Sequence, residues 1–306
     1  PEVFVIGQGL WSPWYVGNSM TDLEKKFGIE RVIDTPVSES ACTGAAVGAS
    51  LAGMKPIVVH PRMDFMLYAM DAIVNQAAKW SHMLGGQAHP GVTIRSIINR
   101  GGEQGAQHSQ ALHAWFAHVP GLRVVMPSTV ADARDLLIAS VLCNDPVMYI
   151  DDRWLYEQEG ELPPVIELDL TIQRPAVSLT GSDITIVASG HASLLTREAA
   201  VQLENEKISV EVIDVRVLNP FHTEEIIVSV NKTKNLLVVD SGWISGGFSA
   251  EVIAKVVEQL PVGCLSNPPA RIALADAPAP TSRVLEKAYY TSTDDVVEAV
   301  KKILNI

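Results

Sequence analysis

Short runs rich in β-branched residues alternate with amphipathic stretches, and this alternation limits the fold more than any other feature of the chain. In the first half we predict strands over residues 3–6, 57–60, 93–98, 123–126 and 147–150, and helices over 20–27, 39–52, 68–79, 109–118 and 130–142. Parallel strands require a crossover between them, usually a helix. The pattern therefore predicts a mostly parallel sheet covered by helices on both faces.

The alternation stops after residue 150 and resumes near residue 184. The stretch between them is acidic and contains Pro163, Pro164 and Pro175, which is typical of a linker. A second series of strands (184–188, 210–214, 235–239, 271–274) and helices (192–205, 223–230, 249–259, 293–304) follows. We predict two three-layer α/β domains with mostly parallel sheets, residues 1–160 and 181–306, joined by a linker over residues 161–180.

The composition excludes several classes of protein. Hydrophobic residues make up 47% of the 306 residues and charged residues 19%, which argues against disorder. The net charge of -12 disfavours nucleic acid or an anionic membrane as the main partner. The chain opens on Pro1 and runs straight into an apolar strand without a signal peptide, although the missing Met suggests that N-terminal residues have been trimmed. We expect a soluble cytoplasmic protein with no membrane span.

Glu39 is the most informative acidic residue. It stands where a loop enters a helix made almost wholly of Ala, Gly, Val and Ser, which predicts close packing of that helix. A carboxylate at the head of the helix would be partly buried near the positive helix end. The alternative is a plain N-terminal cap, although Ser38 can fill that place.

Two further segments carry polar groups next to aromatic or glycine residues. Residues 62–79 combine Arg62, Asp64 and Phe65 with methionines, which suits a site or simply a core helix. Residues 99–110 form a Gly-rich polar loop after a strand, and we expect this loop to present His108 at the start of a helix. A histidine there suits acid–base chemistry, packing or capping. No phosphate-binding loop, complete dinucleotide fingerprint, zinc motif or serine-hydrolase motif accompanies them.

These segments together resemble a known family. Residues 34–39, 63–71, 85–87, 107–110 and 114–125 are similar to the β subunit of thiamine-diphosphate-dependent 2-oxo acid dehydrogenases, the E1 component of the pyruvate and branched-chain complexes in the transketolase superfamily. Residues 214–221 and 281–286 resemble the C-terminal domain of the same family. The resemblance covers nearly the whole chain and lacks only the usual N-terminal helix.

The resemblance implies roles for three residues. Glu39 matches the glutamate that hydrogen-bonds N1′ of the aminopyrimidine of thiamine diphosphate, where a poorly solvated carboxyl group shares a proton. Phe65 matches the aromatic residue that packs on the pyrimidine ring. His108 matches the histidine near the substrate carboxylate, which is associated with acyl transfer to the lipoyl group.

The resemblance also implies a partner. The family binds the diphosphate through Mg²⁺ with a Gly-Asp-Gly motif, and this motif is absent from the sequence. Hard oxygen ligands for Mg²⁺ must then come from another chain. We expect an α subunit that carries them, an α₂β₂ heterotetramer with the active site at its interface, and a lipoyl-bearing E2 component as acceptor.

Because of departures from the family pattern, the resemblance determines neither the substrate nor whether a potassium ion binds. Gln8 and Gly9 replace an acidic pair, Pro61 replaces a glutamine of branched-chain members, and the loop before His108 is short. The potassium site of the family maps near Ile97, Ser140, Val141, Cys143 and Asp145, where the side chains differ from the family pattern, so we expect at most a weak potassium site here.

Three hypotheses remain at this point. The leading one is an E1β-like subunit that decarboxylates a 2-oxo acid and transfers the acyl unit to a lipoyl group. The second is a subunit of a split transketolase or acyloin-forming transferase that acts on an aldehyde or keto sugar, because the Arg62 guanidinium suits a phosphate or carboxylate, although an interface salt bridge suits it as well. The third is a non-catalytic structural subunit.

Overall fold

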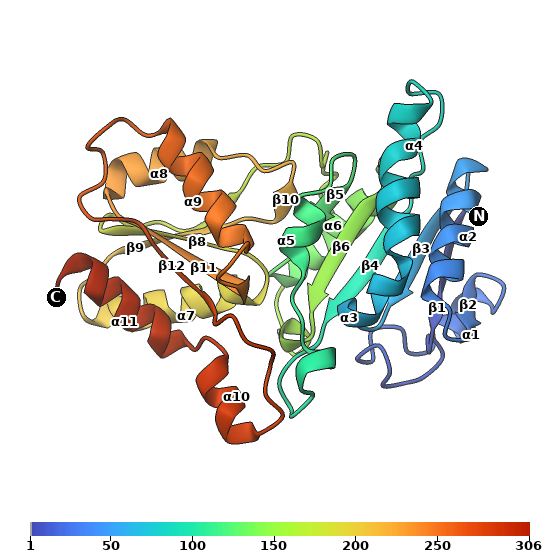
Figure 1. Cartoon of the computed structure of the whole chain (residues 1–306), viewed down its shortest axis with the longest axis horizontal. Helices are drawn as coiled ribbons and strands as arrows, with labels where there is room; N and C mark the ends of the chain where they lie inside the picture. The colour runs from blue at the N-terminus through green and yellow to red at the C-terminus, as the bar shows by residue number, and fades with distance from the viewer. Residues whose placement is uncertain (1) are drawn as a thin grey trace. The chain divides into compact units, whose positions relative to one another are not determined.

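A computed structural model describes residues 2–306 and divides the chain into two compact units (Figure 1). Unit 1 consists of the residues up to Arg100, Gln107–Val125 and Thr129–Thr171. Unit 2 consists of Gly101–Ala106, Met126–Ser128 and Ile172–Ile306. Within the described residues no helix is long and apolar enough to cross a membrane.

The sheet of unit 1 is parallel throughout the pairings described here. Its strands follow the order β5-β6-β4-β3-β1-β2. Their bounds are β1 (Val3–Gln8), β2 (Val32–Thr35), β3 (Lys55–His60), β4 (Thr93–Ile98), β5 (Arg123–Val125) and β6 (Val147–Asp152). The strand β4 is buried along its whole length, as expected for a strand covered on both faces.

Helices flank this sheet (Figure 1). They are α1 (Leu23–Phe27), α2 (Glu39–Leu51), α3 (Met63–Met66), the 3₁₀ turn η1 (Leu67–Ala69), the π-helical η2 (Asp71–Ala77), α4 (Ala78–Met83), η3 (Ala106–His108), α5 (His113–Ala117), α6 (Val130–Leu142) and η4 (Arg153–Leu155). The small-residue helix α2 packs on β1 and β3, and also on α3 and η1. The absence of bulky side chains along α2 allows this close approach.

Some predicted elements of unit 1 are wrong in extent. The helix predicted over 20–27 begins only at Leu23, because Asn18 and Asp22 adopt left-handed φ angles of 62°. The helix predicted over 109–118 is reduced to α5, because the amides of Gln110 and Leu112 donate to Asp64 and to the Met63 sulfur instead of closing a helical turn. The short strand β2 was not predicted.

Unit 2 contains the second predicted sheet. Its order is β12-β11-β8-β9-β7, with parallel pairs except for β7, which is antiparallel to β9. The strands of this unit are β7 (Ala176–Leu179), β8 (Ile184–Ala188), β9 (Val210–Asp214), β10 (Val217–Asn219), β11 (Leu236–Trp243) and β12 (Ala270–Leu274). The helices are α7 (His191–Asn205), α8 (Glu224–Thr233), α9 (Phe248–Gln259), α10 (Arg283–Tyr289) and α11 (Thr293–Leu304).

The apolar core of unit 2 lies between α7, α11 and the sheet. It includes Ile186, Leu203, Val212, Leu237 and Val300, all buried. The predicted class of two mostly parallel α/β sheets with helices is confirmed. The exact boundary with a linker at 161–180 stays a prediction, and β7 begins inside that range. Pro1, which bears on the expected N-terminal trimming, lies outside the described residues.

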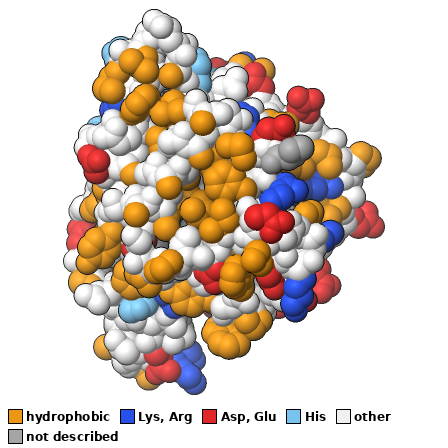
Figure 2. Space-filling view, turned by 90° about the vertical axis from the view of Figure 1, so that its right-hand side faces the viewer, with side chains coloured by type: hydrophobic (Ala, Val, Ile, Leu, Met, Phe, Trp, Pro, Cys, Tyr) orange, Lys and Arg blue, Asp and Glu red, His pale blue; other side chains and the backbone are white. Residues whose placement is uncertain are grey.

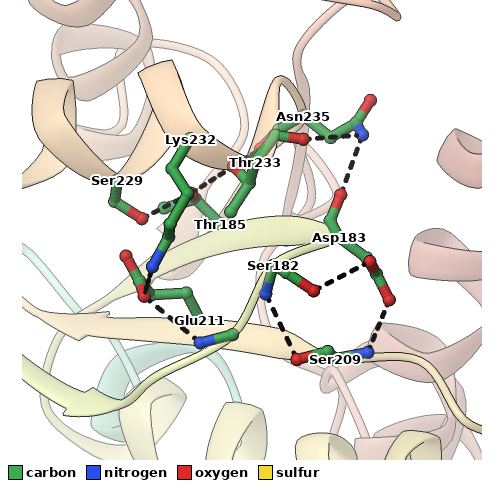
Figure 3. Close-up of polar contacts among 10 residues, drawn as sticks. Ser182, Asp183, Thr185, Ser209, Glu211, Ser229, Lys232, Thr233 and Asn235 are labelled. Carbon is green, nitrogen blue, oxygen red and sulfur yellow. Dashed lines mark hydrogen bonds and ion pairs between the residues drawn. The ribbon is translucent and has the colours of Figure 1, made fainter.

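A polar cluster fastens α8 to β8 and β9 in unit 2 (Figure 3). The Thr185 hydroxyl lies between the hydroxyls of Ser229 and Thr233, at oxygen–oxygen distances of 2.6 Å and 2.7 Å. Lys232 forms an ion pair with Glu211 on β9. Burial alone would raise the pKa of Glu211, but hydrogen bonds from Lys232 and Ser229 outweigh it and the pKa is lowered.

We predict that Thr185→Val destabilises unit 2. Thr185 is 0% exposed, so the substitution leaves two buried hydroxyls without their shared partner, at a cost of about 1–3 kcal/mol. Urea unfolding monitored by circular dichroism measures the change. Thr180→Val, the same substitution at an exposed position, is the control and should stay within about 0.5 kcal/mol of the wild type. Equal effects of the two substitutions would contradict the role given to this cluster.

Candidate functional site

The order of the strands places one ligand-binding position in unit 1. The chain passes from β1 to β2 on one side of β1 and from β3 to β4 on the other side, although β1 and β3 are neighbours. The loops after β1 and β3 therefore diverge. In open parallel sheets, ligands bind beyond the carboxyl ends of the strands at such a switch point.

A small, open hollow lies at this switch point. Glu39, the first residue of α2, is one of the residues that line it. The other lining residues come from the ends of β1, β2 and β3 and from α2: Gly7, Gln8, Thr35, Ser38, Cys42, Val58, Val59, His60 and Pro61. Ser38 is the N-cap residue of α2 but makes no side-chain capping bond. Glu39 is thus half-buried at a helix start, as predicted, and lines the hollow.

His60 closes the hollow from the end of β3. The residue is 2% exposed, and burial lowers the pKa of its imidazole to about 4. Its Nε2 lies 3.1 Å from the Thr43 hydroxyl, and this hydroxyl donates to the Glu39 carbonyl at 2.8 Å. The ring is therefore neutral near pH 7 and is linked through Thr43 to the first turn of α2.

Phe65 and His108 lie together. Their rings meet edge to face, with centroids 5.2 Å apart and planes at 89°. Phe65 belongs to α3, and His108 ends η3 instead of starting a longer helix, so the expected presentation of His108 at a helix start is wrong. Both side chains are half-buried. Because α2 packs against α3, the helix that carries Glu39 contacts the helix that carries Phe65.

Asp64 is the buried carboxyl group next to this aromatic pair. Its Oδ1 accepts hydrogen bonds from the backbone and side chain of Gln110, at 3.1 Å and 2.9 Å. Its Oδ2 is buried and has no hydrogen-bond partner among the described residues. Burial raises the pKa of Asp64 against the opposing effect of the Gln110 hydrogen bonds.

Arg62 has a polar but uncharged partner. With the Asn99 amide oriented so that its oxygen faces the guanidinium, Arg62 donates to that oxygen. Burial and the nearby Arg153 lower the pKa of Arg62. In contrast, the two acidic residues at the end of β6 are paired with arginines. Arg95 forms an ion pair with Asp151 at 2.5 Å, and Arg100 forms a buried ion pair with Asp152.

The loop that leads to His108 is fixed at its start within unit 2. The Glu103 amide donates to both oxygens of Glu286, at 2.9 Å and 3.0 Å, and the Glu286 residue is 6% exposed. Gly101, Gly102 and Glu103 all have left-handed φ angles, between 63° and 75°. The glycine-rich sequence of this loop supplies the conformations that the turn requires.

The residues of the expected potassium site are partly engaged with protein cations. The Cys143 carbonyl accepts from Lys55 Nζ at 3.2 Å, and Asp145 pairs with Arg123 at 2.6 Å. The Ser140 hydroxyl donates to the Leu136 carbonyl. Ile97 is buried in β4 and Val141 lies in α6. The potassium site stays a prediction.

Across the described residues no group of three or more His, Cys, Asp or Glu is arranged to hold a metal ion.

Large apolar side chains are exposed in unit 1. Tyr68 is 78% exposed, Val37 73% and Trp14 69%. They follow β1 and β2 or lie in η1, in the same connections that supply the hollow. The view in Figure 2 shows hydrophobic side chains gathered across one face of the molecule. Exposed apolar surface of this kind marks interaction sites.

Reasoning from the sequence missed His60 as a component of the site, and it named Asp64 only as one polar residue of the segment 62–79. Each stands at or just after the end of β3, the position where parallel strands present functional groups. This position at the end of a predicted strand was the signal in the sequence that could have identified them. Their burial and hydrogen bonds depend on α2 and on residues near 110, which are distant in the sequence.

Family models match both parts of the chain. The model of the transketolase pyrimidine-binding domain matches residues 1–158, and the model of the transketolase C-terminal domain matches residues 176–296. A solved structure entitled "Split gene transketolase, inactive beta4 tetramer" has a TM-score of 0.78 and 23% sequence identity, covering 100% of this chain and 92% of that one. At this identity the likeness concerns the fold alone.

Curated relatives are similar along nearly the whole chain. The pyruvate dehydrogenase E1 component subunit beta of Rickettsia felis is 37% identical over 99% of this chain and 92% of its own length. The mitochondrial subunit of Homo sapiens is 34% identical over 99% of this chain and 82% of its own length. The Rhizobium meliloti subunit is 36% identical, and the chain spans 65% of that relative's length. The chain therefore belongs to the family of β subunits of thiamine-diphosphate-dependent 2-oxo acid dehydrogenase E1 components, within the transketolase superfamily.

Proposed function

We propose that this chain is the β subunit of a heteromeric E1 enzyme that decarboxylates a 2-oxo acid and transfers the acyl unit to a lipoyl group. The observation that carries the proposal is that Glu39 lines a hollow at the switch point of the sheet. The whole-chain similarity to pyruvate dehydrogenase β subunits supports the reaction class.

The residues of the hollow suit the pyrimidine half of thiamine diphosphate. Glu39 would hold a proton at N1′ of the aminopyrimidine, and Cys42 and His60 are the other titratable residues among those that line the hollow. Phe65 would pack against the heteroaromatic ring. When bound, the cofactor supplies the electron sink for decarboxylation next to the 2-oxo group. His108, held by its edge contact with Phe65, would exchange a proton with the substrate or acyl group.

The diphosphate half has no matching ligands here. Mg²⁺ prefers oxygen ligands, and a suitable cluster is absent from the described residues. We propose that an α subunit supplies the Mg²⁺ ligands and that the assembled enzyme is an α₂β₂ heterotetramer. The exposed apolar side chains of unit 1 suit coverage by that subunit. The three cysteines are free thiols, which suits the reducing cytoplasm.

A second candidate keeps the cofactor and changes the acceptor. Arg62 forms no ion pair among the described residues, so its charge is available to a carboxylate or phosphate. This observation favours a transferase that delivers its unit to an aldehyde or keto sugar. The presence of Glu39, Phe65 and His108 in motifs that resemble those of the family argues against the non-catalytic alternative.

We predict that Glu39→Gln lowers kcat of the reconstituted α/β complex by at least about 100-fold, because the amide cannot hold the proton that the carboxyl group shares. The measurement is decarboxylation of 2-oxo acids with an artificial electron acceptor. Glu204→Gln, at an exposed position of α7, is the matched control and should retain wild-type activity. An undiminished rate in Glu39→Gln would refute the role of Glu39 and restore the non-catalytic hypothesis.

We further predict that the complex acylates lipoamide reductively and does not join the same donor to aldehyde acceptors. Product analysis of both reactions with one enzyme preparation distinguishes the two acceptors. Arg62→Gln should leave the lipoamide reaction within about threefold, since the residue already bonds neutral Asn99. Carboligation without lipoamide acylation would establish the second candidate instead.

A further inference from the structure

His60 carries the strongest feature that the proposed function does not use. It is a fully buried, titratable side chain at the switch point, and it lines the same hollow as Glu39. The other titratable side chains that line this hollow are Glu39 and Cys42, both from α2. Burial is the only cause of the lowered pKa of His60, so no charged group compensates the loss of water.

The hydrogen bonds determine which ring nitrogen carries the proton. The Thr43 hydroxyl has a single proton, and it donates this proton to the Glu39 carbonyl at 2.8 Å. The same oxygen lies 3.1 Å from His60 Nε2 and must therefore accept there. Nε2 is the protonated nitrogen, and Nδ1 is a bare acceptor.

The two bonds form a relay from β3 to α2. His60 Nε2–H donates to Thr43, and Thr43 donates to the main chain of Glu39, one helical turn earlier. Ser38, the N-cap residue, gives this turn no side-chain hydrogen bond. The relay thus supplies side-chain support to the turn that carries Glu39, although the cap position does not.

We propose that His60 is a positioning residue for Glu39, acting as a neutral Nε2–H donor through Thr43. The inference rests on the proposed function for the task of Glu39, and it deepens that function by naming what supports the helix turn that carries Glu39.

Neutrality is part of this role. A cationic imidazolium in the same hollow would stabilise the carboxylate form of a neighbouring carboxyl group. A carboxyl group whose task is to share a proton with a heterocycle would then hold that proton less readily. A buried neutral donor supports the helix turn without this effect.

The first test is the tautomer of His60 in the full chain. Nitrogen NMR of ¹⁵N-histidine-labelled protein, with His60 assigned by the signals lost in His60→Gln, should show a protonated Nε2 and an unprotonated Nδ1. Both signals should stay unchanged from pH 8 to pH 5.5, whereas exposed imidazoles protonate over that range. A proton on Nδ1, or a charged ring at pH 7, would overturn the proposal. This readout requires neither cofactor nor partner, so it stands even if the proposed function fails.

The second test uses variants in the reconstituted complex. His60→Gln keeps an N–H donor near the position of Nε2, His60→Phe removes it, and Thr43→Val removes the hydroxyl at nearly constant shape. We expect His60→Phe and Thr43→Val each to lower kcat at saturating thiamine diphosphate by about 10-fold or more, and His60→Gln to stay within about threefold. The double variant His60→Phe/Thr43→Val should be no worse than the poorer single variant, because both break one relay.

Rates are expressed per mole of folded complex, so lost stability alone does not lower them. If His60→Phe fails to fold, Thr43→Val and His60→Gln still carry the comparison. Equal losses in His60→Gln and His60→Phe, or additive losses in the double variant, would overturn the relay. Wild-type complex that binds no thiamine diphosphate would refute the proposed function and leave the tautomer result as it stands.

Discussion

The parallel pairing of β1 with both β2 and β3 is the constraint on which the site depends. Because the three strands run in one direction, their carboxyl ends meet at one edge, and the chain must leave β1 and β3 toward opposite sides. The hollow opens where these connections diverge. Gly7 contributes by allowing β1 to approach the Val59 carbonyl, a contact that a Cβ atom would obstruct. Glu39 lines the hollow from the start of α2, after β2, and His60 lines it from the end of β3.

The pattern of the sequence predicted the fold class because strands and helices alternate strongly in both halves. It did not predict β2, in which Val32 and Ile33 are followed at once by Asp34, so the apolar run is too short to stand out. It overextended the helix at 109–118 because the amides of Gln110 and Leu112 bond to residues 46 and 49 positions earlier. Tertiary contacts of this kind cannot be read from local periodicity.

Only part of the candidate site was predictable from the sequence, because some of its residues depend on tertiary contacts. Glu39, Phe65 and His108 lie in motifs that resemble a family, and the structure brings Phe65 and His108 into ring contact. His60 has no such motif. Its properties arise from burial and from Thr43, whose hydroxyl mediates between β3 and α2. Likewise, only the structure shows that the Asp64 Oδ2 atom is buried without a hydrogen-bond partner among the described residues.

The central claim is that this chain holds only the pyrimidine half of a cofactor site, and cofactor binding tests it most directly. Isothermal titration of the isolated chain with thiamine diphosphate and Mg²⁺ should show no tight stoichiometric binding. The same titration should show one site per αβ pair once the α subunit is added. Tight, one-to-one binding by the isolated chain would contradict the account.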